Sequence, residues 1–154
     1  MNKSKKFILF VLFTLYAITN LQAKTIEIQS DKLIIDRDIG ISTFHKNVYA
    51  QSKDFEIWSE KLILSYNKDI KEIEKIRAKG KVKIIRLDLV VIGDSAVFYP
   101  IENHLKIIGN VILEENDNKI QCDELFMDLN DSSSIMNSKS NNRVKAIISS
   151  NNEY

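Results

Sequence analysis

The chain has 154 residues, of which 22 are basic and 21 acidic, so its formal charge is +1. This length suits one domain with a moderate hydrophobic core. Cys122 is the only cysteine, which excludes an intramolecular disulfide and favours a small buried apolar side chain over a reactive thiol.

The N-terminal segment has the features of a secretory signal peptide. Three lysines within the first six residues precede an apolar run over residues 7–18, and Leu-Gln-Ala at residues 21–23 ends in a small residue at the expected cleavage site. The alternative is a membrane anchor, but a spanning helix requires about 20 apolar residues, and this run is shorter. We therefore predict a signal peptide over residues 1–23 and one exported domain over residues 24–154. Without the signal the chain has 19 basic and 21 acidic residues, which argues against a general nucleic-acid-binding protein.

Most of the remaining chain alternates apolar and polar side chains, which is typical of half-buried β-strands. In "TIEIQ", Ile26 and Ile28 share one face. In "IRLDLVV", residues 85–91, the same pattern puts the odd-numbered apolar residues on one face and Arg86 and Asp88 on the other. "KIQCDELFM" and "RVKAII" continue the alternation, and "NKD", "ENDN" and "NDSSS" supply turn residues. The pattern predicts an all-β fold.

Two stretches are harder to assign. "KDIKEIEKIRAKG", residues 68–80, spaces three isoleucines by three residues, and its composition favours a helix. We predict instead a strand that follows a turn near Asn67, because the surrounding sequence is strand-like; a short helix is the alternative. Residues 130–142 are too polar to assign beyond a loop or the end of a hairpin.

The chain contains an internal repeat. Residues 31–64 align without a gap onto residues 94–127. Within these halves "SDKLII" returns as "SEKLIL", "GDSAVF" and "CDELFM", and "KNV" returns as "GKV", "GNV" and "NRV". These echoes indicate a unit of about thirty residues that occurs about four times.

A unit of this size cannot bury its apolar face alone, so stacked copies are expected to share one core. We expect about four strands of about five to eight residues in each unit. Two antiparallel sheets would then pack face to face, with inward side chains from both filling the middle.

These phrases, in this order, resemble the periplasmic lipopolysaccharide-transport bridge proteins of Gram-negative bacteria, the LptA/OstA-like family. The resemblance rests on "IEIQSDKLIID", "SEKLIL", "GDSAVFY", "GNV" and "RVKAII", and covers about Thr25 to Ser149. It implies an exported β-jellyroll with an open groove, no enzymatic activity, no cofactor and no metal. Where the family has Gly-Asn-Val first, this chain has Lys46-Asn47-Val48, so that turn must differ or tolerate a side chain.

The resemblance also implies partners. The ligand would be the lipid A portion of lipopolysaccharide, carried from the inner to the outer membrane. An LptC-like inner-membrane protein would meet the N-terminal edge near Lys24–Ser30. An LptD-like outer-membrane protein or another copy would meet the C-terminal strand near Arg143–Ser149, by strand addition. The alternatives are a membrane-anchored LptC-like component of the same route and a periplasmic β-scaffold that binds no lipid.

A lipid carrier requires a long apolar groove without strong polar anchors, and the alternation nominates its lining. Plain core packing is the alternative for every residue in the set. The predicted lining residues are Ile26, Ile28, Leu33, Ile35, Phe44, Val48, Ile57, Leu62, Ile107, Val111, Leu113, Ile120 and Leu125. Residues 68–86 hold eight basic and three acidic side chains. From this strip Lys81 and Lys83 are candidates to meet head-group phosphates, with a solvated strand face as the alternative.

An enzymatic function has little support in the sequence. "GDS" at residues 93–95, with His104 downstream, is similar to the nucleophile phrase of some esterases. That chemistry requires Ser on a tight turn between a strand and a helix, whereas Ser95 stands inside an alternating strand and its counterpart in the repeat is Lys32. His45 and His104 have no neighbouring ligands at metal spacing.

Overall fold

The structure of the protein, a computed structural model, describes residues 25–139 and 141–149. The predicted signal peptide lies outside these residues. The described part is built from β-strands alone, and it contains no helix long and apolar enough to cross a membrane. The strands are β1 Glu27–Gln29, β2 Lys32–Asp36, β3 Ile41–Gln51, β4 Glu56–Asn67, β5 Glu72–Arg86, β6 Leu89–Tyr99, β7 His104–Glu115, β8 Asn118–Asp128, β9 Ser133–Asn137 and β10 Lys145–Ile147.

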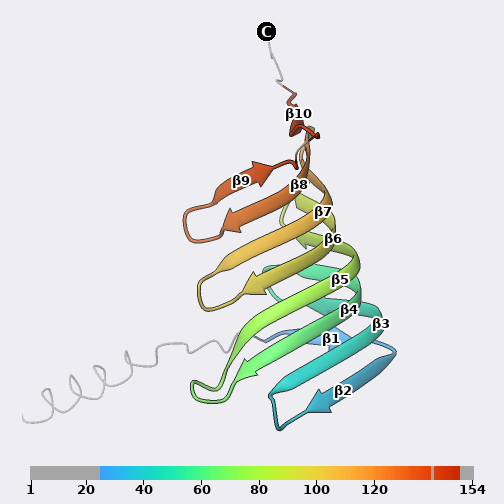
Figure 1. Cartoon of the computed structure of the whole chain (residues 1–154), viewed down its shortest axis with the longest axis vertical. Coiled ribbons are helices and arrows are strands. Elements are labelled where there is room, and N and C mark those ends of the chain that lie inside the picture. The colour runs from blue at the N-terminus through green and yellow to red at the C-terminus, as the bar shows by residue number, and fades with distance from the viewer. Residues whose placement is uncertain (1–24, 140, 150–154) are drawn as a thin grey trace, which may run out of the picture.

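The strands confirm the all-β class that the alternation predicted. All ten belong to one bent antiparallel sheet, which takes the place of the two separate sheets that we expected. Its order is β1-β3-β4-β5-β6-β7-β8-β10, with β2 also paired to β3 and β9 also paired to β8. From β3 to β8 each strand pairs with the next strand in the sequence, so short turns set the register of the long strands. The strands stack like rungs along the longest axis, from β2 at the bottom to β9 and β10 at the top (Figure 1).

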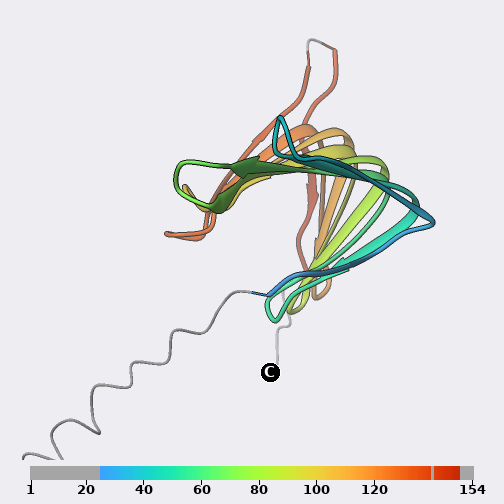
Figure 2. The same cartoon turned by 90° about the horizontal axis from the view of Figure 1, so that it is seen from below.

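Each long strand bends near its middle, where the register shifts. The shifts fall between His45 and Val48, between Lys79 and Val82, and at matching positions of the other long strands. Such bulges bend a strand and raise its local twist. As a result the sheet folds into two walls that meet along one side, the corner, and diverge toward the other (Figure 2).

The two walls are defined by this corner. The first wall consists of β2, β9 and residues 41–45, 61–67, 72–79, 95–99, 104–108 and 123–128. The second wall consists of β1, β10 and residues 48–51, 56–59, 82–86, 89–93, 111–115 and 118–122. The expectation of four short strands per unit was wrong. The long strands have 11 to 15 residues, and one bent strand supplies a segment to both walls.

The recurring "KNV", "GKV" and "GNV" phrases form the corner. Gly109 and Asn110 both adopt the left-handed region, with φ of 84° and 49°. Glycine and asparagine tolerate this region better than other residues. The equivalent residues are Lys46 and Asn47, with φ of 62° and 48°, and Gly80 and Lys81, with φ of 78° and 49°. The first turn therefore keeps the same left-handed geometry and accepts a side chain at Lys46.

The acidic residue of the other recurring phrase, which begins as "SDKLII", contacts the corner phrase. In each instance the carboxylate of one strand contacts a polar side chain of the following segment at the corner. The four contacts are Asp31 with Asn47 Nδ2 at 2.9 Å, Glu60 with Lys81 Nζ at 3.1 Å, Asp94 with Asn110 Nδ2 at 2.9 Å, and Asp123 with Asn142 Nδ2 at 3.3 Å. This recurring contact brings the two phrases together in space. The number of repeats itself stays a prediction.

The hydrophobic core lies between the walls, next to the corner. Leu62, Ile107 and Leu125 of the first wall are completely buried, and Val48 and Val111 of the second wall are 1% exposed. Full burial of one such side chain stabilises a fold by about 1.5–3 kcal/mol. The core therefore holds the walls together at the corner, and inward residues farther from it are less covered.

The sequence prediction for residues 85–91 was wrong. β5 ends at Arg86, Leu87 and Asp88 form a two-residue turn, and β6 begins at Leu89. Leu87 adopts φ of 53° and is 88% exposed. Because the turn interrupts the alternation, Ile85 faces outward and Arg86 lines the space between the walls.

The other uncertain stretches resolve into strands. Residues 72–86 form the longest strand, β5, after a turn at residues 68–71, so the strand prediction is confirmed and the helix alternative fails. Pairing with β4 and β6 on both sides outweighs the helical propensity of this segment. Residues 133–137, which the sequence left as a loop or hairpin end, form β9 against β8.

Candidate binding groove

The open side of the fold contains three neighbouring hollows that form a groove between the walls. The hollow nearest β2 has a volume of about 530 Å³ and shares Tyr66 and Ile73 with the next, which also measures about 530 Å³. That second hollow shares Phe55 and Phe98 with the third, of about 270 Å³. Because neighbouring hollows share lining residues, the groove runs along the stacking direction of the strands.

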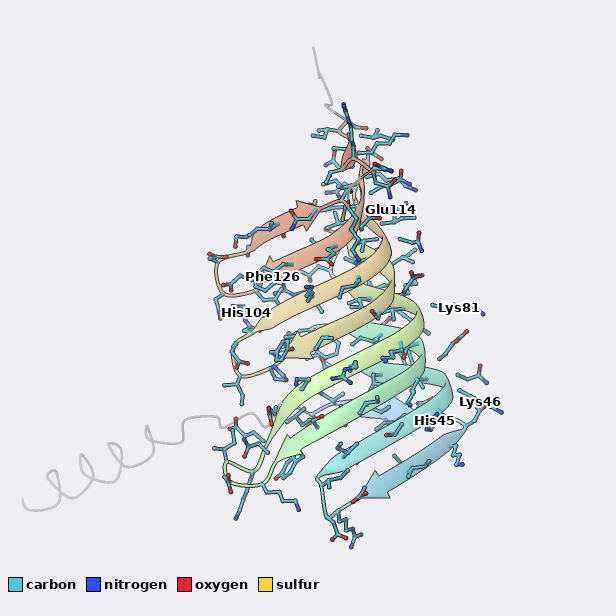
Figure 3. The ribbon with its side chains drawn as sticks, in the orientation of Figure 1. His45, Lys46, Lys81, His104, Glu114 and Phe126 are labelled. Atoms are coloured by element: carbon cyan, nitrogen blue, oxygen red, sulfur yellow. The ribbon has the colours of Figure 1, made fainter. Side chains whose placement is uncertain are left out.

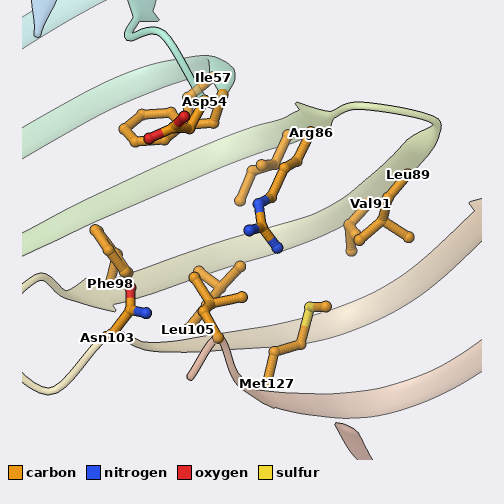
Figure 4. Close-up of a pocket in the computed structure, with 12 residues that line it drawn as sticks. Asp54, Ile57, Arg86, Leu89, Val91, Phe98, Asn103, Leu105 and Met127 are labelled. Carbon is orange, nitrogen blue, oxygen red and sulfur yellow. The ribbon is translucent and has the colours of Figure 1, made fainter. Parts of the chain in front are cut away.

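The third hollow, named the central hollow because its strand residues come from β4 to β8 in the middle of the sheet, is mostly apolar (Figure 4). Phe55 from the second-wall turn and Phe98 from β6 meet edge to face, with ring centroids 6.3 Å apart. The two rings therefore bridge the walls at the junction of two hollows. The remaining lining consists of Asp54, Ile57, Ile84, Arg86, Leu89, Val91, Asn103, Leu105, Met127 and Leu129.

The sequence-predicted lining residues divide by depth. Ile26, Ile35 and Ile57 line the groove hollows. Most of the others lie deeper, in the core beside the corner; these are Phe44, Val48, Leu62, Ile107, Val111, Leu113 and Leu125. Ile28 and Ile120 are partly buried against that core. A contact of these deeper residues with a ligand stays a prediction.

Leu33 belongs to the same inward row but is 48% exposed. It lies opposite Phe44, which is 9% exposed, so both side chains share the inward face. Ile35, two residues on, is 56% exposed. The difference arises because β2 pairs only with β3 within the described residues, so that no further strand covers its inward face.

Sequence reasoning missed most of the lining. The missed apolar residues include Ile41, Phe55, Leu64, Ile73, Ile84, Leu89, Val91, Phe98, Ile101, Leu105, Met127 and Leu129. Most of these residues point to the same face of the sheet as the core residues but stand farther from the corner. In β7, for example, Ile107 is completely buried, whereas Leu105, two residues farther from Gly109, reaches the central hollow. Counting residues from the corner phrase would have separated groove from core.

The rim of the first wall carries exposed isoleucines. Ile39, Ile70 and Ile101 stand in the turns after β2, β4 and β6, and they are 64%, 51% and 51% exposed. All three turns lie at the same side of the first wall, and Ile101 also lines the second hollow. The groove therefore has an apolar lip along the first wall.

The basic strip at residues 68–86 does not form one patch. Lys81 lies on the outside of the corner (Figure 3), where it pairs with Glu60 at 3.1 Å. Lys83 lies on the outer face of the second wall, 5.4 Å above the Trp58 ring. Neither lysine lines a groove hollow, whereas Arg86 lines the central one.

Few of the described residues have a pKa that departs clearly from its ordinary value. A hydrogen bond from the Asn130 backbone N–H, with a smaller effect of His104 3.1 Å away, lowers the pKa of Asp128. Burial, reinforced by the charge of Asp123, raises the pKa of the Cys122 thiol. Cys122 is thus buried, as the sequence predicted, and its raised pKa disfavours the thiolate form. Within the described part of the chain no three His, Cys, Asp or Glu side chains cluster as a metal site.

Both ends of the sheet present strands with an unused edge. At the N-terminal end β1 and β2 each pair only with β3, and at the C-terminal end β9 and β10 each pair only with β8, within the described residues. Each end therefore offers one short edge strand per wall. Unpaired edges of this kind can accept a strand from another chain.

Comparisons with known proteins agree with this geometry. The uncharacterized protein RP507 of Rickettsia prowazekii (strain Madrid E) is 29% identical over 127 residues, which is 79% of this chain and 87% of that protein. The crystal structure of LptH, the LptA-homologous periplasmic component of the lipopolysaccharide transport device of Pseudomonas aeruginosa, superposes with a TM-score of 0.74 at 13% identity. It covers 82% of this chain and 96% of LptH, and it supports the same fold. Residues 27–133 match the family described as LptA/(LptD N-terminal domain) LPS transport protein. The chain therefore belongs to this LptA-like family of lipopolysaccharide-transport proteins.

Proposed function

We propose that the protein is a periplasmic carrier of lipopolysaccharide that holds the acyl chains of lipid A in the groove between its walls. The observation that carries the proposal is the series of three hollows, which share lining residues and follow the long axis of the sheet. The similarity to LptH, a periplasmic component of a lipopolysaccharide transport device, supports the same role.

The chemistry of the groove suits a ligand that must both bind and move on. Burial of one CH₂ group stabilises a complex by about 0.8 kcal/mol, so one acyl chain of about a dozen carbons represents on the order of 10 kcal/mol. A groove lined mainly by aliphatic and aromatic side chains can supply this energy without fixing the ligand at one place. A chain could then pass from hollow to hollow with little change in free energy.

The edges of the sheet suit assembly into a bridge. We propose that β1 and β2 accept an LptC-like inner-membrane protein and that β9 and β10 accept an LptD-like outer-membrane protein or a second copy. Strand addition at such edges is head to tail, and a head-to-tail contact that does not close generates a filament. The groove would then continue from one molecule to the next.

Export by a signal peptide over residues 1–23 belongs to the same proposal, because a bridge between the membranes must lie in the periplasm. N-terminal sequencing of the protein from the periplasmic fraction checks it. A mature chain that starts at Lys24 supports the soluble carrier. Retention of Met1 on a membrane-bound protein would favour the LptC-like alternative.

Photo-cross-linking tests lipid binding directly. Phe98 and Phe126 are a matched pair, because both are phenylalanines of the first wall, but Phe98 lines the groove and Phe126 lies on the outer face beside His104. A benzoylphenylalanine at position 98 should capture lipopolysaccharide, and the same residue at position 126 should not. Equal capture at both positions, or none at either, would leave a β-scaffold as the better description.

The same method tests the partners. A cross-linker at Leu33 in β2 should yield an adduct with the inner-membrane component, and one at Ile147 in β10 should yield an adduct with the outer-membrane component or a second copy. Both residues are about half exposed, at 48% and 51%. Exchange of the two products between the positions would reverse the proposed direction of the bridge.

A further inference from the structure

Arg86 breaks the apolar pattern of the groove at one defined depth. The inward residues of β5 in the second wall are Val82, Ile84 and Arg86, and they become steadily more exposed away from the corner. Val82 is completely buried, Ile84 is 7% exposed and Arg86 is exposed. The series therefore ends in a cation at the mouth of the groove, where β5 turns into β6.

The guanidinium of Arg86 points into the central hollow, across from Leu105 on the first wall (Figure 4). Leu89 lies directly opposite Arg86 in the register between β5 and β6. The arginine stem thus continues the apolar lining, and its charged end reaches the open part of the hollow. Long cationic side chains commonly pack their apolar stem against other apolar groups and keep the charged end in water.

The charge of Arg86 is not matched by a protein group. Among the described residues no ion pair or side-chain hydrogen bond joins Arg86 to another group. Other cations of the strip are engaged: Lys81 pairs with Glu60, and Lys83 lies over Trp58. Asp54 lines the same hollow but lies outside ion-pair distance of Arg86. Arg86 therefore retains its five N–H donors for a ligand.

We infer that Arg86 binds the phosphate of an acylated, anionic lipid head group when the acyl chains occupy the central hollow. The inference rests on the proposed function and adds a position and a chemical class of contact to it. The planar guanidinium forms two parallel hydrogen bonds to a phosphate, which suits recognition of this group better than an ammonium does. The deeper residues Ile84 and Val91 would lie beside the acyl chains. One ligand would therefore contact the apolar residues inside the hollow and the cation at its opening.

Equilibrium binding of two lipids to the purified protein tests the inference. The probes are bisphosphorylated lipid A and the same lipid A without its phosphates. The wild type should bind the phosphorylated probe about tenfold more tightly, as one charge-assisted contact implies. Arg86→Gln should remove this preference, so that the variant binds the two probes with equal affinity. Arg86→Lys should restore part of it, because a point charge remains.

Lys83→Gln is the matched control, since it removes the same charge from the same strand but on the outer face, and it should change neither affinity. Asp54→Asn should strengthen binding of the phosphorylated probe alone, because it removes a like charge from the hollow. Failure of the wild type to bind either lipid would refute the proposed function itself.

Equal wild-type binding of the two lipids would refute only the assignment of Arg86. The same conclusion would follow if Lys83→Gln reproduced the effect of Arg86→Gln. Inorganic phosphate provides the remaining arm. If inorganic phosphate bound to the wild type as tightly as phosphorylated lipid A and lost this affinity in Arg86→Gln, the site would be one for free anions, and the lipid assignment would be overturned.

Discussion

The side-chain amide of Asn110 donates a hydrogen bond to the Asp94 carboxylate over 2.9 Å, where β6 and β7 pass the corner of the sheet. Asn47 and Asp31 make the same contact over the same distance in the first half of the chain. These pairs join neighbouring strands at the residues whose backbone is left-handed. They therefore help to fix the angle at which the walls diverge, on which the width of the groove depends.

Asn110→Ala should lower the free energy of unfolding by about 1–2 kcal/mol, because it removes this hydrogen bond and places a residue with a Cβ but no polar side chain in the left-handed region. Urea denaturation of the variant and the wild type measures the difference. In a double-mutant cycle with Asp94→Ala, the two losses should not add, since both remove one interaction. Full additivity would show that the contact contributes nothing.

At the residue that precedes asparagine in the corner phrase, substitution to glycine and substitution from glycine should have opposite effects on stability. Lys46→Gly should stabilise the protein by up to about 1 kcal/mol, because glycine adopts a φ of 62° without steric cost. Gly109→Ala should destabilise it, because φ is 84° and the new Cβ would collide with the Asp94 carboxylate. Thermal unfolding should move the two midpoints in opposite directions. A lower midpoint for Lys46→Gly would mean that the lysine stem makes contacts that outweigh backbone strain.

The outer face of the first wall contains a row of basic side chains. Lys32, His45, Lys61 and Lys79 lie directly opposite one another on four adjacent strands. Lys61→Glu should therefore raise the stability by about 0.2–1 kcal/mol, by replacing repulsion with attraction to Lys79. The gain should shrink as salt is added, and Lys61→Gln should give a smaller gain. A salt-independent effect would point to packing instead of charge.

The stability at acid pH should depend on Asp128. The Asn130 backbone N–H and His104 lower the pKa of Asp128 in the folded protein, so the folded state favours the carboxylate. This contribution is fully present above the ordinary aspartate pKa of about 3.9 and is lost as the pH falls through the lower folded pKa. Unfolding midpoints of Asp128→Asn should thus lie below those of the wild type at pH 7 and approach them at pH 3. A difference in midpoint that stays the same at pH 7 and pH 3 would show that protonation of Asp128 is not coupled to folding.

The apolar lip of the first wall should assist lipid uptake without supporting the fold. Ile70 is 51% exposed, so Ile70→Ser should change stability by no more than about 0.5 kcal/mol. If the lip packs against an acyl chain, affinity should fall roughly fourfold for each CH₂ group that the variant leaves in water. Ile135→Ser, at a 58% exposed residue of the outer face, is the control and should bind normally. Equal affinities of the two variants would remove the lip from the binding site.

The alternation of side chains was enough to predict the strands, the all-β class and the inward face at most positions. Ile107 and Leu125, for example, are completely buried on the predicted face. The recurring acidic and asparagine phrases indicated a repeat, and both come together at the corner. Alternation failed at Leu87, where an unforeseen two-residue turn restarts the pattern and brings Arg86 inward.

Sequence by itself determined which face most side chains present, because successive residues of a strand point to opposite sides and the turns between long strands are short. Only the tertiary structure decided which inward residues pack as core and which line the groove. Leu105 and Ile107 share a strand, a face and an apolar character, and they differ in their distance from the corner. That distance matters because the bend at Gly109 joins walls that separate as they leave it, and only contacts across the space between them, such as that of the Phe55 and Phe98 rings, show how far apart the walls lie.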